Sequence, residues 1–283
     1  DYKNIAKVNK EKLLLLGKSF LQDRFDSKLS EISVTTTKNI VSKRKSKLEI
    51  LNYLGLSNKK KTIVVFCNCW PDFPNAQGVS HFDDHEDFFN YTLNVARELT
   101  EFNWVFKAHP AEYMYGDNIT LKKLMHGKNL KHIKTIYSQI DWSSTLSIMD
   151  CAVTSSGSIG HEYVALGGKV IIARPNAYTN WGFSHFAKSR NEYKIMLKNF
   201  KQLKLPSKKQ KEKALIYTAL KFGSFQANQE NQLIFPLGRL SYRIWPQLKN
   251  FIELNNKSIK KETRLIEKFI MSKFSNFSFF KYM

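Results

Sequence analysis

The sequence contains only three cysteines, Cys67, Cys69 and Cys151. Each falls in a short apolar run that predicts a buried strand, and the spacing of Cys67 and Cys69 puts both side chains on one face of that strand. No second pair of ligands follows at the spacing of a metal site. We therefore interpret the three as reduced core thiols of a cytosolic protein, and we expect no bound metal.

Long apolar runs and a leader pattern are also missing. The sequence has no stretch of about 18 consecutive apolar residues, the length that a membrane-spanning helix needs. Its start, Asp-Tyr-Lys-Asn, has neither an initiator Met nor the charged-then-apolar pattern of a signal peptide. We therefore expect no membrane span and no secretory leader, and we interpret the chain as one that begins inside a longer protein.

Acidic residues are scarce relative to basic ones. The 45 Lys and Arg residues against 24 Asp and Glu residues give a formal net charge of +21. Such a surplus predicts attraction to an anionic partner, which could be nucleic acid, an anionic membrane face or a phosphorylated substrate. The 283 residues, 42% of them hydrophobic, are enough for one large or two modest globular domains.

Strands alternate with helices through the middle of the chain. The alternation predicts right-handed crossovers and a Rossmann-like, doubly wound parallel sheet over residues 61–200. Residues 1–60 read as a lysine-rich helical connector, consistent with the end of an N-terminal domain that lies upstream. Residues 201–283 read as a basic helical C-terminal region. The strands are predicted at 62–69, 103–107, 132–137, 151–153 and 169–173, and the helices at 11–25, 46–54, 84–100, 121–126, 143–149, from 158, from 191, 208–222 and 240–254.

A serine-rich turn lies between the fourth predicted strand and the helix after it. The turn contains Ser155, Ser156, Gly157 and Ser158. Free N–H groups and the positive end of the helix dipole attract anions, and small side chains let a phosphate approach. The turn therefore predicts a phosphate site, although an ordinary strand-to-helix turn with a serine cap would have the same composition.

A second polar feature follows the second predicted strand, which ends in Lys107 and the pair His109-Pro110. In a parallel sheet this end opens on the same edge as the serine turn. A histidine held extended by the following proline can donate to a phosphate oxygen, and Glu162, one turn into the helix, is spaced to accept both hydroxyls of a ribose. Taken alone, His109 could equally be a satisfied core histidine. Together the two features predict a nucleotide site, and we expect Lys107 to contact the donor as well.

Two loops complete the predicted site. The loop at 174–183 is too aromatic for a solvent connection, so we expect it to line the site and Asn180 to contact the donor. Asp72, in the loop after the first strand, is the candidate general base, with Asp83 or Asp84 less directly placed. The alternative for Asp72 is a turn-forming aspartate between prolines.

These features carry a resemblance to a known family. The His109-Pro110 pair, the turn from Ser155 to Glu162 and the loop from Pro175 to Phe183 resemble the nucleotide-sugar-binding half of bacterial capsule and lipopolysaccharide glycosyltransferases of the GT-B fold. The resemblance covers 62–197. It implies that His109 and the serine turn hold the donor phosphate, that Glu162 meets the ribose, and that neither a metal nor a cofactor is required.

Within that group, the pattern is similar to enzymes that transfer Kdo or sialic acid from CMP-activated donors to glycan or glycolipid acceptors. The first alternative is a CDP-alditol glycerophosphotransferase-type polymerase, and the second is a nucleotide-sugar epimerase, which shares the fold. A basic nucleic-acid-binding module is a further alternative. However, the lysines concentrate in connectors and terminal helices and are not interleaved with aromatic residues on strands, so we expect no nucleic-acid partner.

The C-terminal segment 257–283 combines lysines with phenylalanines. A basic helix with an aromatic face suits an anionic membrane surface, although a terminal helix that packs on the domain would show the same pattern. We therefore expect a cytoplasmic protein that is peripheral on the inner face of the cytoplasmic membrane.

Overall fold

A computed structural model describes most of the first 223 residues of the chain. Contacts divide the chain into two units, of which residues 18–217 form one and residues 1–17 with 218–283 form the other. The sheet and the candidate site lie in the unit formed by residues 18–217. The described residues are 2–25, 45–70, 80–109, 112, 120–128, 130–137, 140 and 142–223.

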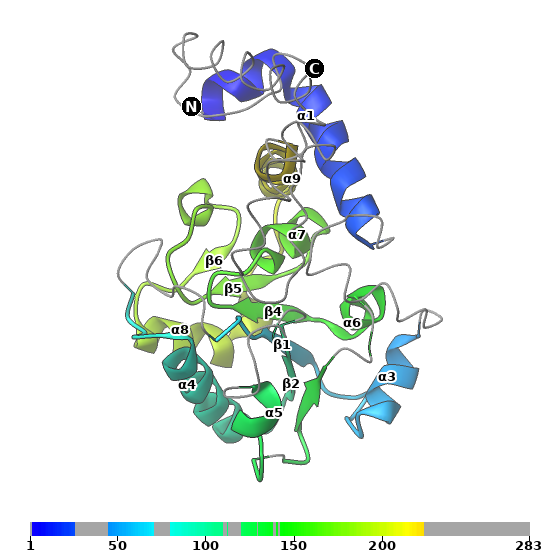
Figure 1. Cartoon of the computed structure of the whole chain (residues 1–283), viewed down its shortest axis with the longest axis vertical. Coiled ribbons are helices and arrows are strands. Elements are labelled where there is room, and N and C mark those ends of the chain that lie inside the picture. The colour runs from blue at the N-terminus through cyan, green and yellow to red at the C-terminus, as the bar shows by residue number, and fades with distance from the viewer. Residues whose placement is uncertain are drawn as a thin grey trace, which may run out of the picture. The chain divides into compact units, whose positions relative to one another are not determined.

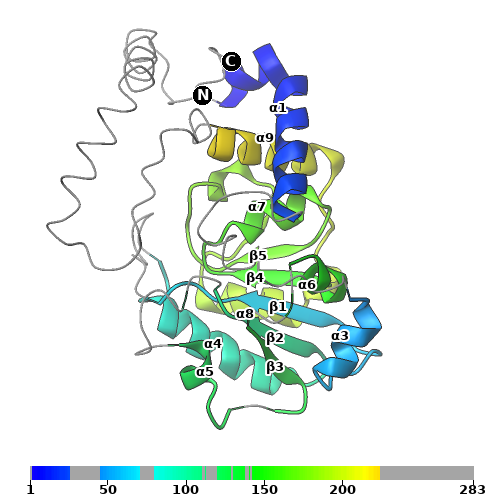
Figure 2. The ribbon, with the colours of Figure 1, turned by 45° about the vertical axis from the view of Figure 1, so that its right-hand side comes forward.

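Six parallel strands form one sheet in the order β3-β2-β1-β4-β5-β6. Figure 2 shows β3, β2, β1, β4 and β5 stacked in this order. The predicted Rossmann-like, doubly wound sheet is therefore confirmed. One strand, β6, was not predicted: it has two residues and pairs with β5 at the edge of the sheet. The strands are β1 (Thr62–Phe66), β2 (Asn103–Lys107), β3 (Ile133–Ile136), β4 (Cys151–Thr154), β5 (Val170–Ile172) and β6 (His185–Phe186).

The central strands are buried on both faces, as their near-continuous apolar sequences predict. Val65 of β1 is in register with Phe106 of β2 on one side and with Val153 of β4 on the other. All three side chains are fully buried. The carboxyl ends of these strands therefore finish at the same edge.

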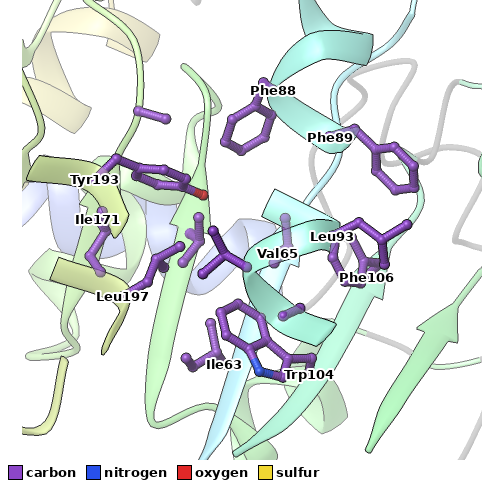
Figure 3. Packing of buried hydrophobic residues seen from close by; sticks show 14 of the residues in the cluster. Ile63, Val65, Phe88, Phe89, Leu93, Trp104, Phe106, Ile171, Tyr193 and Leu197 are labelled. Carbon is purple, nitrogen blue, oxygen red and sulfur yellow. The ribbon is translucent and has the colours of Figure 1, made fainter. Parts of the chain in front are cut away.

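Three helices cover one face of the sheet (Figure 1): α4 (His85–Glu98), α5 (Leu121–Leu124) and α8 (Arg190–Lys198). Large aromatic side chains fill this layer (Figure 3). Phe89 of α4 meets Phe106 edge to face at 5.4 Å between ring centroids. Such pairs stabilise a core beyond the burial of their area.

The opposite face is covered by α3 (Lys47–Tyr53), α6 (Trp142–Ile148) and α7 (Ile159–Ala165), with Ala214 of α9 (Lys208–Gly223) in the same cluster. Ser46 and Glu49 form a reciprocal capping box at the start of α3. The side chains of Ile50 and Leu51 are fully buried in this layer. Part of the segment predicted as a connector therefore belongs to the core of the sheet domain.

Helix α1 (Tyr2–Phe25) begins earlier than its apolar pattern predicted, and Phe20 and Leu21 near its end are buried. Among the helices that the structure describes, none combines the length and apolar character needed to cross a membrane. The loop with Asp72, the helix at 240–254 and the segment 257–283 lie outside the described residues. Predictions for those parts stay predictions.

Candidate functional site

The strand order reverses between β1 and β4. Strands on one side of this pair continue toward β3, and those on the other side continue toward β6. In open parallel sheets, ligands bind in the crevice outside the carboxyl ends of the strands at such a switch point. The segments that leave this edge are 67–70 after β1, 108–109 after β2, 155–158 after β4 and 173–176 after β5. The structure therefore places the predicted His109 and the predicted serine turn on one edge.

His109 is half-buried at this edge and is held by a thiol. The Sγ atom of Cys69 lies 3.0 Å from Nδ1 of the His109 ring. The N–H of Cys67 donates to the carbonyl of Lys107 at 3.0 Å and thereby keeps the two segments parallel beyond their strands. His109 therefore lies at the carboxyl edge of the sheet, and one of its ring nitrogens contacts the Cys69 thiol.

The serine turn is braced from inside the protein. The N–H of Gly157 donates to Thr154 Oγ1 at 2.9 Å, and the hydroxyl of Tyr178 donates to the carbonyl of Gly157 at 2.6 Å. Ser156 and Ser158 are half-buried, whereas Ser155 is fully buried with its hydroxyl 3.5 Å from His85 Nδ1. Any contact of the turn's side chains with a ligand therefore falls to Ser156 and Ser158.

Two glycines make this packing possible. A Cβ atom on Gly157 would lie 2.8 Å from Thr154 Oγ1, and one on Gly160 would overlap the phenol of Tyr178. Both glycines are thus required by close approach and not by an unusual backbone angle. Because these glycines lack a Cβ atom, Tyr178 packs directly on the first turn of α7 and holds the serine turn in one shape.

An arginine that the sequence reasoning missed lies at the start of α7. Arg24, in the last turn of α1, has its Nε atom 2.8 Å from Glu162 Oε1 and donates from Nη2 to Ser158 Oγ at 3.3 Å. The Glu162 contact has the distance of an ion pair without the alignment of a good hydrogen bond. Glu162 is only 1% exposed, and a buried carboxylate requires such a partner. Arg24 lies 134 positions from Ser158, and no local pattern links them.

Two aromatic side chains of the loop at 174–183 pack in the core. Tyr178 and Phe183 are buried and stack at 5.7 Å between centroids, and Tyr217 packs against both rings. These two aromatic side chains therefore pack in the core, and the expectation that the loop lines the site stays a prediction. Asn180, predicted to contact the donor, is exposed in the 3₁₀ turn η2 (Thr179–Trp181).

The same loop begins with a buried arginine. Arg174 is 1% exposed, and its Nη1 donates to the carbonyl of Asp84 at 3.1 Å. Burial lowers the pKa of Arg174, and the carboxylates of Asp84, Asp87 and Asp83 oppose that effect. Asp84 is the N-cap of α4, since its side chain accepts from the N–H of Asp87. This alternative candidate base therefore has a structural role.

A second missed residue is Glu112, which follows the His109 segment. Its N–H donates to the carbonyl of His109 at 3.0 Å, and its Oε1 accepts from the N–H of Leu121 at 2.7 Å. Burial raises the pKa of Glu112, and the hydrogen bond from Leu121 offsets part of that rise. A carboxyl group with a raised pKa near the end of a strand is a candidate proton acceptor. Its position three residues after His109 is the only sequence signal.

The remaining features lie elsewhere. A cavity of about 440 Å³ lies at the amino end of β5 and is lined by Lys169, His185 and the segment 202–207. It is not at the carboxyl edge, so we do not assign the donor to it. Lys107, predicted to contact the donor, is half-buried at the end of β2. Within the described part of the chain, no group of three or more His, Cys, Asp or Glu side chains is arranged to hold a metal ion.

The strand order and the site together define an α/β protein with a Rossmann-like sheet and polar groups at its switch point. No family model and no curated protein matches the chain. Among solved structures, the chain is similar to Thermosulfurimonas dismutans KpsC, a beta Kdo 2,4 transferase. The sequence identity is 16%, the match covers 73% of this chain and 55% of that chain, and the TM-score is 0.43.

Two further solved structures are similar at this level. UDP-GlcNAc 2-epimerase from Neisseria meningitidis has 13% identity over 61% of this chain and 43% of its own, with a TM-score of 0.37. The wall teichoic acid polymerase TagF has 14% identity over 62% of this chain and 39% of its own, with a TM-score of 0.36. The chain thus matches between 39% and 55% of the lengths of these proteins.

Proposed function

We propose that the carboxyl edge of the sheet binds the phosphate of a nucleotide-sugar donor. In this proposal the chain is the donor-binding half of a GT-B glycosyltransferase of bacterial surface polysaccharide biosynthesis. The observation that carries the proposal is the pair of polar features at one switch point, with His109 after β2 and the Arg24–Ser158 contact after β4.

Arg24 supplies the cation of the proposed site. Its guanidinium carries five N–H donors in a planar fork that matches a phosphate. Glu162 holds this group at the turn, and Arg24 keeps 18% of its side chain exposed. Ser158 places a hydroxyl beside it at 3.3 Å. In this arrangement Glu162 orients Arg24.

The proposed chemistry is a metal-independent displacement. The bond between the sugar carbon and the phosphate oxygen of the donor breaks, the acceptor hydroxyl oxygen bonds to that carbon, and the nucleotide leaves with the electron pair. Arg24 and His109 donate hydrogen bonds to the leaving phosphate and thereby stabilise the charge that develops on it. The acceptor's proton passes to a carboxylate, for which Asp72 is the first candidate and Glu112 the second.

We further propose a CMP-activated donor that carries a Kdo-like or sialic-acid-like sugar, and a glycan or glycolipid acceptor. The His109-Pro110 pair with the serine turn supports this choice. A CDP-alditol polymerase would use the same phosphate contacts, and an epimerase would use the same fold. The net charge of +21 supports contact with an anionic membrane at the cytoplasmic face through the segment 257–283.

A thermal-shift panel of CMP, CDP, UDP and GDP tests the nucleotide assignment. We expect a cytidine nucleotide to give the largest shift, because a ligand at about 100 times its dissociation constant adds about 2.7 kcal/mol of stability. A larger shift with UDP would rule out the cytidine assignment. Product analysis then separates the enzyme classes, since an epimerase changes the donor sugar without any acceptor.

A further inference from the structure

The contact between Cys69 and His109 joins the ends of two neighbouring strands. Cys69 follows β1, in the centre of the sheet, and is only 2% exposed. His109 follows β2 and lies at the carboxyl edge of the sheet, where it is half-buried. The 3.0 Å separation between Sγ and Nδ1 is within hydrogen-bonding distance for a sulfur atom.

The chemistry of the two groups decides which one donates. A neutral imidazole carries one N–H and one lone pair, and the lone pair is a strong acceptor, whereas sulfur is a weak acceptor. A thiol S–H can donate to that lone pair, whereas the reverse arrangement would place the ring N–H against the weaker acceptor. The favoured arrangement therefore has the Cys69 S–H donating to Nδ1. The ring proton then resides on Nε2, on the far side of the ring.

We propose that Cys69 is a positioning residue that fixes His109 as the Nε2–H tautomer. In this tautomer Nε2–H is a hydrogen-bond donor, the group that an anionic oxygen needs. The use of this donor on a nucleotide phosphate rests on the function proposed above, whereas the tautomer itself does not. Without the thiol, Nδ1 loses a partner that favours one of the two neutral tautomers.

Long-range ¹H–¹⁵N correlation spectra of the full chain, labelled at histidine nitrogens, measure the tautomer directly. We expect the His109 Nδ1 signal of the unsubstituted protein to be that of an unprotonated nitrogen and the Nε2 signal that of a protonated one. The His109→Gln variant assigns these signals among those of the seven histidines. A protonated Nδ1 in the neutral ring of the unsubstituted protein would overturn the proposal, and this result needs no folded cysteine variant.

Three substitutions sharpen the test. Cys69→Ala is expected to shift the His109 signals toward a mixture of tautomers, and Cys69→Ser, which keeps a hydroxyl donor, is expected to restore most of the original pattern. Cys151→Ala is the matched control, because Cys151 is also a buried thiol of the sheet and instead contacts the carbonyl of Ala152. Unchanged His109 signals in Cys69→Ala would contradict the assigned role.

Nucleotide titration of the same proteins separates this inference from the proposed function. If both hold, Cys69→Ala weakens CMP or CDP binding by about 10-fold, the size expected for one misdirected hydrogen bond, and Cys69→Ser recovers it. Equal affinity in Cys69→Ala and the unsubstituted protein would overturn the proposed link between thiol and phosphate. If the tautomer is as expected but no nucleotide binds, the positioning role stands and the proposed function fails.

Discussion

Arg24 and Glu162 show how the environment of one residue changes its expected role. The sequence pattern assigns Glu162 to a ribose, yet the carboxylate is 1% exposed and lies 2.8 Å from a guanidinium nitrogen. Burying a charged carboxylate without a partner costs several kcal/mol. The contact with Arg24 therefore allows the Glu162 carboxylate to be buried. Glu162 therefore acts first on Arg24, and through Arg24 on whatever binds at the turn.

Glu112 gives a prediction of pH-dependent stability. Burial raises its pKa above the ordinary 4.5, so the folded state binds the proton more tightly than the unfolded state. The stabilisation from the protonated carboxyl is full below the unfolded-state pKa and is lost as pH rises through the folded-state pKa. We expect Glu112→Gln, which cannot ionise, to melt at a higher temperature than the parent at pH 7 and to lose this advantage near pH 4.

Melting curves between pH 4 and pH 8 measure this effect. The control is Glu101→Gln, an exposed position that changes the net charge equally. A difference between Glu112→Gln and the parent that stays constant over this range would show that ionisation of Glu112 does not affect stability. The same result would remove Glu112 as a candidate proton acceptor.

At the scale of elements, contacts with Tyr178 fix the shape of the turn from Thr154 to α7. The phenol packs on Gly160 and donates to Gly157, so the strand, turn and helix form one unit with the loop after β5. Sequence reasoning located this turn because small residues cluster there. It did not show that Tyr178 and Phe183 pack in the core, because composition does not reveal whether an aromatic ring faces a core or a ligand.

Gly160→Ala tests that packing. The added methyl group overlaps the Tyr178 ring, which is 3% exposed and has little room to move. We expect a loss of about 1 to 3 kcal/mol in the free energy of unfolding, the range for overpacked cores, measured by urea denaturation. In a Tyr178→Ala background the same substitution should cost little. Equal costs in the two backgrounds would mean that the glycine is required for another reason.

At the scale of the whole molecule, the sheet was predictable and two parts of the site were not. The strands β1, β2, β4 and β5 are largely apolar runs, and every residue of β4 and β5 is buried, whereas Lys134 and Thr135 of β3 are only half-buried. Strand β6 was not predicted, because its two residues, His185 and Phe186, are too few to show a strand pattern in the sequence. The roles of Arg24 and Cys69 at the site were not predicted, because their partners are distant in sequence and only the folded chain brings them together.

The central claim is that a nucleotide phosphate binds at the carboxyl edge through His109 and Arg24. Isothermal titration with CMP and CDP tests it on the full chain, with Arg24→Ala and His109→Ala as the informative variants. Lys204→Ala is the matched control, because Lys204 is an exposed cation beside the cavity at the other end of β5. We predict that each of the first two substitutions weakens binding by about 10-fold to 100-fold, as expected for a lost charged hydrogen bond, and that the control leaves it unchanged. Undiminished affinity in Arg24→Ala and His109→Ala, or a loss confined to Lys204→Ala, would contradict the assignment of this edge as the donor site.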